Sequence, residues 1–297
     1  MRSSGRYILL LAWLALGLPL VTACAAIPTG RFDALSAASR SVLDSSSATY
    51  SRIEGLQRNY MVFNPAEGRL TPESFKAVVV DDQGRKLDFD LRPRLRFRES
   101  VLEALSNYTD VLQAFAKKDY QGDLDAASQN LYASVSDLAA RAPDNPAGQK
   151  AAGLLAAAVN ELGRAALERT RRRALRRAME AAQPGVEGVV DLIAADNVLI
   201  VQAVRTMQNG ILRSANGLRP TAPSLGRVQL DERVSRLVDE SSEILASLDA
   251  LSRAVKAIPR AHAEIRESLD DDRPSLAQLQ SLIAEAKRLS QFYGSLK

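Results

Sequence analysis

An unusual density of arginine marks one short segment of the chain. Residues 169–177 read RTRRRALRR and hold six arginines in nine positions. They are Arg169, Arg171, Arg172, Arg173, Arg176 and Arg177. Because the planar guanidinium fork of arginine matches phosphate and carboxylate groups in bidentate geometry, the segment is a candidate docking surface for an anionic partner. That partner would be lipid headgroups, lipopolysaccharide phosphates or the acidic surface of a protein.

Two other interpretations of the arginine segment are open. Charge runs on helices are commonly solvated faces, answered here by acids on an adjacent helix such as Asp191, Asp239 or Glu240. A basic run is also a signature of nucleic-acid binding. The segment contains no aromatic side chain on which bases could stack, and the N-terminus described below argues for a location away from nucleic acid. We therefore expect no nucleic-acid partner.

Residues that usually carry catalysis are scarce. His262 is the only histidine, and no Gly-x-Ser-x-Gly sequence is present to place a nucleophile beside it. Zinc sites usually need several His or Cys ligands, and the acidic stretch at residues 270–272 lacks the alternating ligands and turn glycine of a calcium-binding loop. We therefore predict a non-enzyme with no metal and no cofactor, and we expect His262 to be a partly exposed residue on a helix.

The single cysteine, Cys24, follows a short apolar stretch near the N-terminus. Arg2 and Arg6 are the only charges before that stretch, at residues 8–21, and the first acidic residue is Asp33. Basic residues, a short apolar region and then small residues are typical of a secretory signal. A membrane span needs roughly 20 apolar residues, so this stretch would cross a bilayer poorly.

Val21-Thr22-Ala23-Cys24 resembles the lipobox of bacterial lipoprotein precursors, an aliphatic residue and two small residues before an invariant cysteine. The resemblance implies that residues 1–23 are a cleaved signal peptide and that Cys24 carries acyl chains such as palmitate, which tether the protein to the cell envelope. Ala25, where an aspartate would signal inner-membrane retention, favours the periplasmic face of the outer membrane. The alternatives are a cleaved signal with an incidental cysteine, or an uncleaved anchor spanning residues 7–27.

Composition indicates long helices. The whole chain has 39 Lys and Arg and 35 Asp and Glu. Removal of Arg2 and Arg6 with the signal leaves two more basic than acidic residues, so the mature protein is close to neutral. Overall charge therefore gives no steering toward polyanions, although local clusters still can. The chain has only 5% aromatic residues and is rich in Ala, Leu, Ser and Arg, a composition unlike that of a barrel. We expect a tether at residues 24–31 and one helical domain at residues 32–297.

Apolar spacing predicts a bundle of long antiparallel helices. The first is expected at about residues 32–60, and the segment from Arg94 to Pro143 holds two more. A long helix at about residues 147–182 is expected to end at Pro184-Gly185, because proline and glycine commonly terminate helices. The strongest pattern has apolar positions spaced four and three apart over four heptads, which is typical of coiled-coil packing. It comprises Leu230, Val234, Leu237, Ser241, Ile244, Leu248, Leu251, Val255 and Ile258.

Two further features complete the predicted fold. Asn197 lies on the apolar seam of the helix after Gly185, where a buried polar residue sets register more often than it binds a ligand. Around residues 74–92, apolar residues alternate with other residues before a turn and with charged residues after it, which predicts one β-hairpin. The expected fold is mainly α: an elongated antiparallel helical bundle with coiled-coil-like packing and one small β-hairpin insertion.

These features favour a lipid-anchored envelope protein that acts as a non-enzymatic helical interaction or scaffold module. Its partners would be the membrane, through the N-terminal lipid, and an envelope protein or anionic lipid headgroups. The alternative is a membrane-active protein, because pore-forming helical toxins also combine long helices with a β-hairpin. Charged residues between Asp81 and Asp90 make that hairpin costly to place in hydrocarbon. Heptad seams can also be buried between two copies, so a homo-oligomer is a further alternative.

Overall fold

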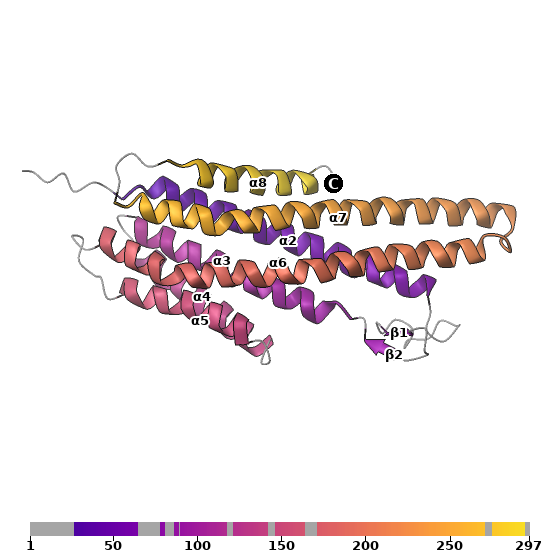
Figure 1. Ribbon diagram of the computed structural model, residues 1–297, viewed down its shortest axis with the longest axis horizontal. Coiled ribbons are helices and arrows are strands. Elements are labelled where there is room, and N and C mark those ends of the chain that lie inside the picture. Colours follow the sequence, from indigo (N-terminus) through magenta and orange to yellow (C-terminus); the bar gives the residue numbers. More distant parts are fainter. Residues whose placement is uncertain are drawn as a thin grey trace, which may run out of the picture.

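The computed structural model describes residues 27–64, 78–80, 86–88, 90–117, 121–141, 146–163, 171–270 and 275–294. These residues form seven helices and two short strands. The helices are α2 (Thr29–Phe63), α3 (Arg92–Ala116), α4 (Gln121–Arg141), α5 (Pro146–Gly163), α6 (Arg171–Leu218), α7 (Ser224–Glu267) and α8 (Ala277–Gly294). They lie side by side in an elongated bundle (Figure 1). The prediction of a mainly α-helical bundle is confirmed.

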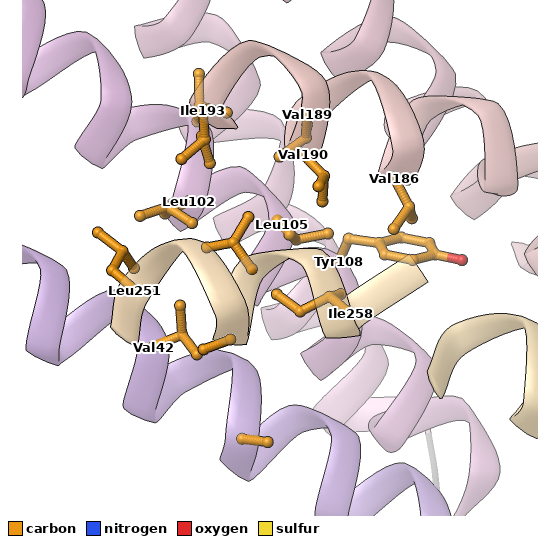
Figure 2. Packing of buried hydrophobic residues seen from close by; sticks show 14 of the residues in the cluster. Val42, Leu102, Leu105, Tyr108, Val186, Val189, Val190, Ile193, Leu251 and Ile258 are labelled. Atoms are coloured by element: carbon orange, nitrogen blue, oxygen red, sulfur yellow. The ribbon is translucent and has the colours of Figure 1, made fainter. Parts of the chain in front are cut away.

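The two longest helices, α6 and α7, run the length of the molecule. They contain 48 and 44 residues, which corresponds to about 72 and 66 Å at 1.5 Å per residue. With α2 and α3 they enclose the hydrophobic core, where Figure 2 shows Tyr108 of α3 close to Val186 of α6 and Ile258 of α7. The remaining helices extend this core: α4 packs on α3, α5 packs on α6, and α8 packs on α7 and α2.

Small polar residues let α2 pack closely on its neighbours. Ser46 Oγ donates to Val42 O at 2.6 Å, and Thr49 Oγ1 donates to Ser45 O at 2.9 Å. Bonds to the carbonyl one turn back satisfy a buried hydroxyl without a bulky partner. The hydroxyls of Thr49 and Ser247, the latter in α7, are also 2.8 Å apart. The serine-rich middle of α2 is therefore a contact between helices.

The prediction of a single long helix at residues 147–182 is wrong. Two helices occupy this region: α5 ends at Gly163 and α6 begins at Arg171, and residues 164–170 lie outside the described residues. The helix α6 then continues through Pro184. Proline removes one hydrogen bond from a helix interior, and packing of α6 on α5 and α7 offsets that loss. Local sequence signals for a helix end are overridden by these tertiary contacts.

Gly185 explains why the proline-glycine pair lies within α6. A Cβ atom at this position would lie 3.0 Å from Ala151 O and 3.0 Å from Leu154 Cβ, both in α5. These separations are tighter than ordinary van der Waals contact, so a side chain would push the two helices apart. The glycine therefore allows the close approach of α5 to α6.

Asn197 lies on the buried seam of α6, as predicted. Its Nδ2 donates to Leu248 O of α7 at 3.3 Å, and its Oδ1 accepts from Arg98 Nη2 of α3 at 3.3 Å. The buried Arg98 guanidinium also donates to Ile193 O and lies 5.2 Å from the ring centroid of Tyr50 in α2. Burial raises the pKa of Tyr50 to about 12, so its hydroxyl stays protonated. This polar layer joins all four core helices.

The heptad seam of α7 is buried over only part of its predicted length. From Leu237 to Ile258 every predicted seam residue is buried, whereas Leu230 and Val234 are only half-buried. We call residues 216–236 the α6–α7 tip, and none of them is buried. In Figure 1 the tip extends beyond the end of α2. At the base of the tip α2 still contacts α7, where Arg233 Nη2 donates to Asn59 Oδ1. Beyond the end of α2 the seam is open.

Two short strands lie between α2 and α3 in sequence. Strand β1 (Val78–Val80) pairs antiparallel with β2 (Lys86–Asp88), and Val79 is opposite Leu87. Most other residues of the hairpin predicted at about residues 74–92 lie outside the described residues. A hairpin insertion beyond this short pairing therefore stays a prediction.

Candidate functional site

Arg171 is a structural residue at the start of α6. Its side chain is buried, with 5% exposure. Its Nη2 donates to Phe115 O at 2.6 Å and also to Lys117 O, and its Cζ lies 5.7 Å from the Phe115 ring centroid. The last carbonyls of a helix have no partner within that helix and attract cations. Arg171 therefore caps the end of α3, and its guanidinium is not accessible to a docking partner.

Arg176 has an acidic partner, but it is not one of the three acids named from the sequence. Its Nη1 lies 2.9 Å from Asp270 Oδ2, just after the end of α7. The hydrogen bond with Asp270 raises the pKa of Arg176 above its ordinary value. Asp239 and Glu240 lie about 45 Å away along α7, at 1.5 Å per residue. Both members of the ion pair are partly exposed, so it contributes little to stability.

The remaining arginines of α6 face solvent to different degrees. Arg173 and Arg177 are exposed, and within the described part of the chain neither forms an ion pair. Arg172 is half-buried and has other interactions. Together, Arg172, Arg173 and Arg176 line an open hollow of about 390 Å³ with Leu269 and Asp270. We call Arg173 and Arg177, with this hollow, the arginine surface.

The arginine surface lies at the end of the bundle where the described chain begins. Gln113 Nε2, near the end of α3, donates to Asp33 Oδ1 in the first turns of α2 at 2.7 Å. Arg171 joins the same end of α3 to the start of α6. The start of α2 therefore lies at this end, as Figure 1 also shows, and Ile27, the first described residue, is two residues before it. Cys24 and Arg169 lie outside the described residues.

His262 is buried, with 1% exposure, so the expectation of a partly exposed histidine is wrong. Its Nδ1 lies 2.6 Å from Gln183 Oε1, and its Nε2 lies 2.9 Å from the Tyr108 hydroxyl. Burial lowers the pKa of His262 to about 3 and raises that of Tyr108 well above its ordinary value. The neutral imidazole therefore donates to Gln183 and accepts from Tyr108.

The histidine network joins three helices, α3, α6 and α7. Gln183 Nε2 donates to Glu187 Oε1 at 2.8 Å and to Pro259 O at 3.3 Å. Each polar atom of His262 and Gln183 is thus engaged in a contact between or along helices. The partners lie 79 and 154 residues from His262 in sequence, which is why periodicity alone does not reveal them.

The α6–α7 tip carries apolar side chains that sequence reasoning missed. Leu218, Leu225 and Val228 are 53%, 70% and 54% exposed. Arg219 Nε lies 2.9 Å from Asp231 Oδ1, while Arg227 and Arg236 are exposed. Large apolar side chains gathered on one exposed end, with arginines beside them, have the composition of a protein interface.

The surface also has a hollow in the middle of the bundle. A hollow of about 440 Å³ lies between α3 and α6, and it is lined by Pro93, Arg94, Phe97, Leu192, Ala195, Asp196 and Leu199. Among the described residues, no group of three or more His, Cys, Asp or Glu side chains could hold a metal ion. In the same part of the chain, no helix is both long and apolar enough to span a membrane.

Comparison with known proteins finds no matching family model, no similar curated protein and no similar solved structure. Functional inference therefore rests on the residues of this chain.

Proposed function

We propose that this protein is a lipid-anchored protein of the bacterial cell envelope that acts as a non-enzymatic helical interaction or scaffold module. The observation that carries the proposal is the exposed α6–α7 tip, which lies at the opposite end of the bundle from the start of α2 (Figure 1). One end of the molecule is then attached to a membrane, and the other end is free to bind a partner.

The lipid anchor follows from the lipobox resemblance and the position of Ile27. Cys24 lies three residues before Ile27, so its acyl chains are within about 11 Å of the bundle at full chain extension. Several acyl chains hold a protein stably on a bilayer, since each buried methylene contributes roughly 0.8 kcal/mol. The periplasmic face of the outer membrane is the favoured location because Ala25, and not aspartate, follows the cysteine.

A stiff bundle suits a scaffold. The buried seam of α7 continues for three heptads from Leu237 to Ile258, and the Arg98 polar layer fixes the register of the core helices. Coiled-coil-like packing of α6 on α7 would carry the tip at a constant distance from the anchored end. At the tip, Leu225 and its apolar neighbours would fill a pocket on an envelope protein, with arginines contacting an acidic rim.

Photo-crosslinking in living cells tests this proposal. A photoreactive residue at position 225 of the full chain is expected to give a discrete crosslinked product, and position 218 should capture the same protein. Position 287, where exposed Lys287 lies on α8, is the matched control and should not. Val228→Glu should abolish the product, because it places a charge in the apolar contact. Equal products from positions 225 and 287, or none from 225 and 218, would contradict an interaction at the tip.

A further inference from the structure

We propose that the arginine surface binds the phosphate groups of anionic lipids in the bilayer that holds the anchor, and so sets the orientation of the bundle on the membrane. This inference rests on the proposed function, because it assigns a partner to the anchored end. The groups that make the contact are the exposed guanidinia of Arg173 and Arg177, together with the hollow beside them.

Position is the first argument. Arg173 and Arg177 lie two and six residues after Arg171, which is about 3 and 9 Å along the helix axis. Arg171 itself is hydrogen-bonded to the end of α3, beside the first turns of α2. Because Ile27 immediately precedes α2 and a lipid at Cys24 would lie within about 11 Å of it, the anchor brings this end of the bundle to the headgroup layer.

The balance of charge at this end is the second argument. Two other cations at this end have acidic neighbours: Arg176 pairs with Asp270, and Lys117 Nζ lies 3.4 Å from Asp123 Oδ2. Arg173 and Arg177 have no such pair within the described residues. Unpaired, exposed guanidinia bind phosphate oxygens through bidentate hydrogen bonds. The guanidinia of Arg173 and Arg177 are therefore accessible cations, although the protein as a whole is nearly neutral.

The shape of the surface is the third argument. Arg172, Arg173 and Arg176 line one open hollow with Leu269 and Asp270, and the single carboxylate, that of Asp270, is paired with Arg176. An open hollow with guanidinia at its edge admits a phosphate that projects from a plane. Two arginines bind weakly on their own, but a covalent anchor keeps the phosphates at high effective concentration. A weak contact is then sufficient to fix an orientation.

Vesicle co-sedimentation tests this inference without the lipid anchor. The chain from residue 24 onward, with Cys24→Ser, keeps every described residue and is mixed with vesicles of phosphatidylcholine alone or with equal phosphatidylglycerol. We expect binding to the anionic vesicles only, weakening as salt rises. The double variant Arg173→Gln, Arg177→Gln should lose roughly tenfold or more in affinity, since each arginine near an anionic surface is worth about fivefold.

A charge-matched variant at the other end is the control. Arg227→Gln with Arg236→Gln removes two exposed arginines from the α6–α7 tip and should leave vesicle binding unchanged. Equal losses in the two double variants would overturn the inference, because binding would then reflect overall charge. Equal binding to both kinds of vesicle, or no binding at low salt with lipid in large excess, would also overturn it. Thermal unfolding of each variant should match that of the parent protein.

The outcome is separable from that of the proposed function. The arginine surface could instead bind a protein. A photoreactive residue beside that surface would then give a crosslinked product in cells that the double variant Arg173→Gln, Arg177→Gln abolishes, while vesicle binding is unaffected. That result overturns the lipid assignment. If the tip has no partner but the vesicle experiment succeeds, the membrane contact stands and the interaction module fails.

Discussion

At the scale of single residues, three buried polar side chains each join several helices. Arg98, Asn197 and His262 are all hydrogen-bonded to residues of other helices. A buried polar group left without a partner costs about 1–3 kcal/mol, so these bonds disfavour any shift of one helix along another. Only Asn197 was assigned this role from the sequence, because it interrupts an otherwise apolar seam.

We predict that His262 makes the protein sensitive to acid. Its pKa is about 3 in the fold, below its ordinary value of 6.5, so between these pH values the unfolded chain binds a proton that the folded chain does not. The stabilising contribution is complete above pH 6.5 and is lost as pH falls. Urea unfolding should show this as a slope that approaches 1.4 kcal/mol per pH unit for one proton. His262→Gln should reduce that slope between pH 6.5 and 4.

An unchanged slope in the His262→Gln variant would mean that the histidine is not buried as described. Because the chain has no other histidine, any remaining dependence in this range comes from carboxylates, which titrate mainly below pH 5.

We also predict that substitutions of two nearby arginines differ in their effect on the free energy of unfolding. Arg171→Gln removes the guanidinium that caps α3 and should lower the free energy of unfolding by about 1–3 kcal/mol. Arg173→Gln changes an exposed side chain and should alter it by less than about 0.5 kcal/mol. Chemical denaturation of both variants measures the difference. Similar losses in both would show that the arginine segment acts as one structural unit.

The arginine segment also shows what sequence alone could not resolve. Its composition identifies a candidate surface, but the partners of Arg171 are backbone carbonyls more than 50 residues away. Backbone carbonyls have no signature in a sequence. Which guanidinia are engaged and which are exposed therefore depends on how α6 lies on α3.

At the scale of helices, heptad spacing predicted α7 well because a repeated apolar seam requires no knowledge of the partner. Burial at the tip was mispredicted for the same reason. Leu230 and Val234 continue the heptad spacing, but they are only half-buried because few other helices cover α7 there. At Pro184-Gly185 a local rule failed where packing on α5 and α7 decides the outcome. Periodicity thus identified the helices. Where each helix ends, and which of its apolar residues are buried, depend on contacts with the other helices.

We predict that Gly185→Ala destabilises the bundle although alanine favours helices. The new Cβ would meet Ala151 O and Leu154 Cβ at 3.0 Å, and overpacking of this kind costs about 1–3 kcal/mol. The gain in helix propensity is about 1 kcal/mol, so the net loss should be about 1 kcal/mol. Thermal or urea unfolding measures it.

Gly153→Ala in α5 is the matched substitution, because a Cβ there meets nothing within 4 Å. It should stabilise the protein by about 0.5–1 kcal/mol through helix propensity alone. If both substitutions stabilise the protein, α5 and α6 are not in close contact at Gly185.

At the scale of the whole molecule, the two ends of the bundle differ in what they offer. One end has the start of α2 and the arginine surface, and the other combines exposed arginines with exposed leucine and valine side chains. The proposed function divides the tasks of attachment and recognition between them. Mutations at one end should then leave the task of the other end intact.

We predict that Cys24→Ser abolishes attachment. In cells fed a palmitate analogue, the parent protein should be labelled and should sediment with membranes, because its acyl chains insert in the bilayer. The Cys24→Ser variant should be unlabelled and should not mature by cleavage before residue 24. Mass spectrometry of the N-terminus distinguishes the two forms. An unlabelled parent protein, or a variant with an identical N-terminus, would contradict lipidation.

The antiparallel pairing of α6 and α7 fixes the distance between the two ends of the bundle. If one end rests on the bilayer, the lengths of these two helices set the height at which the tip meets its partner. Insertion of seven residues into each helix at paired positions would preserve the seam and raise the tip by about 10 Å. Such an insertion should abolish capture of a partner held at fixed height and leave capture of a mobile partner unchanged.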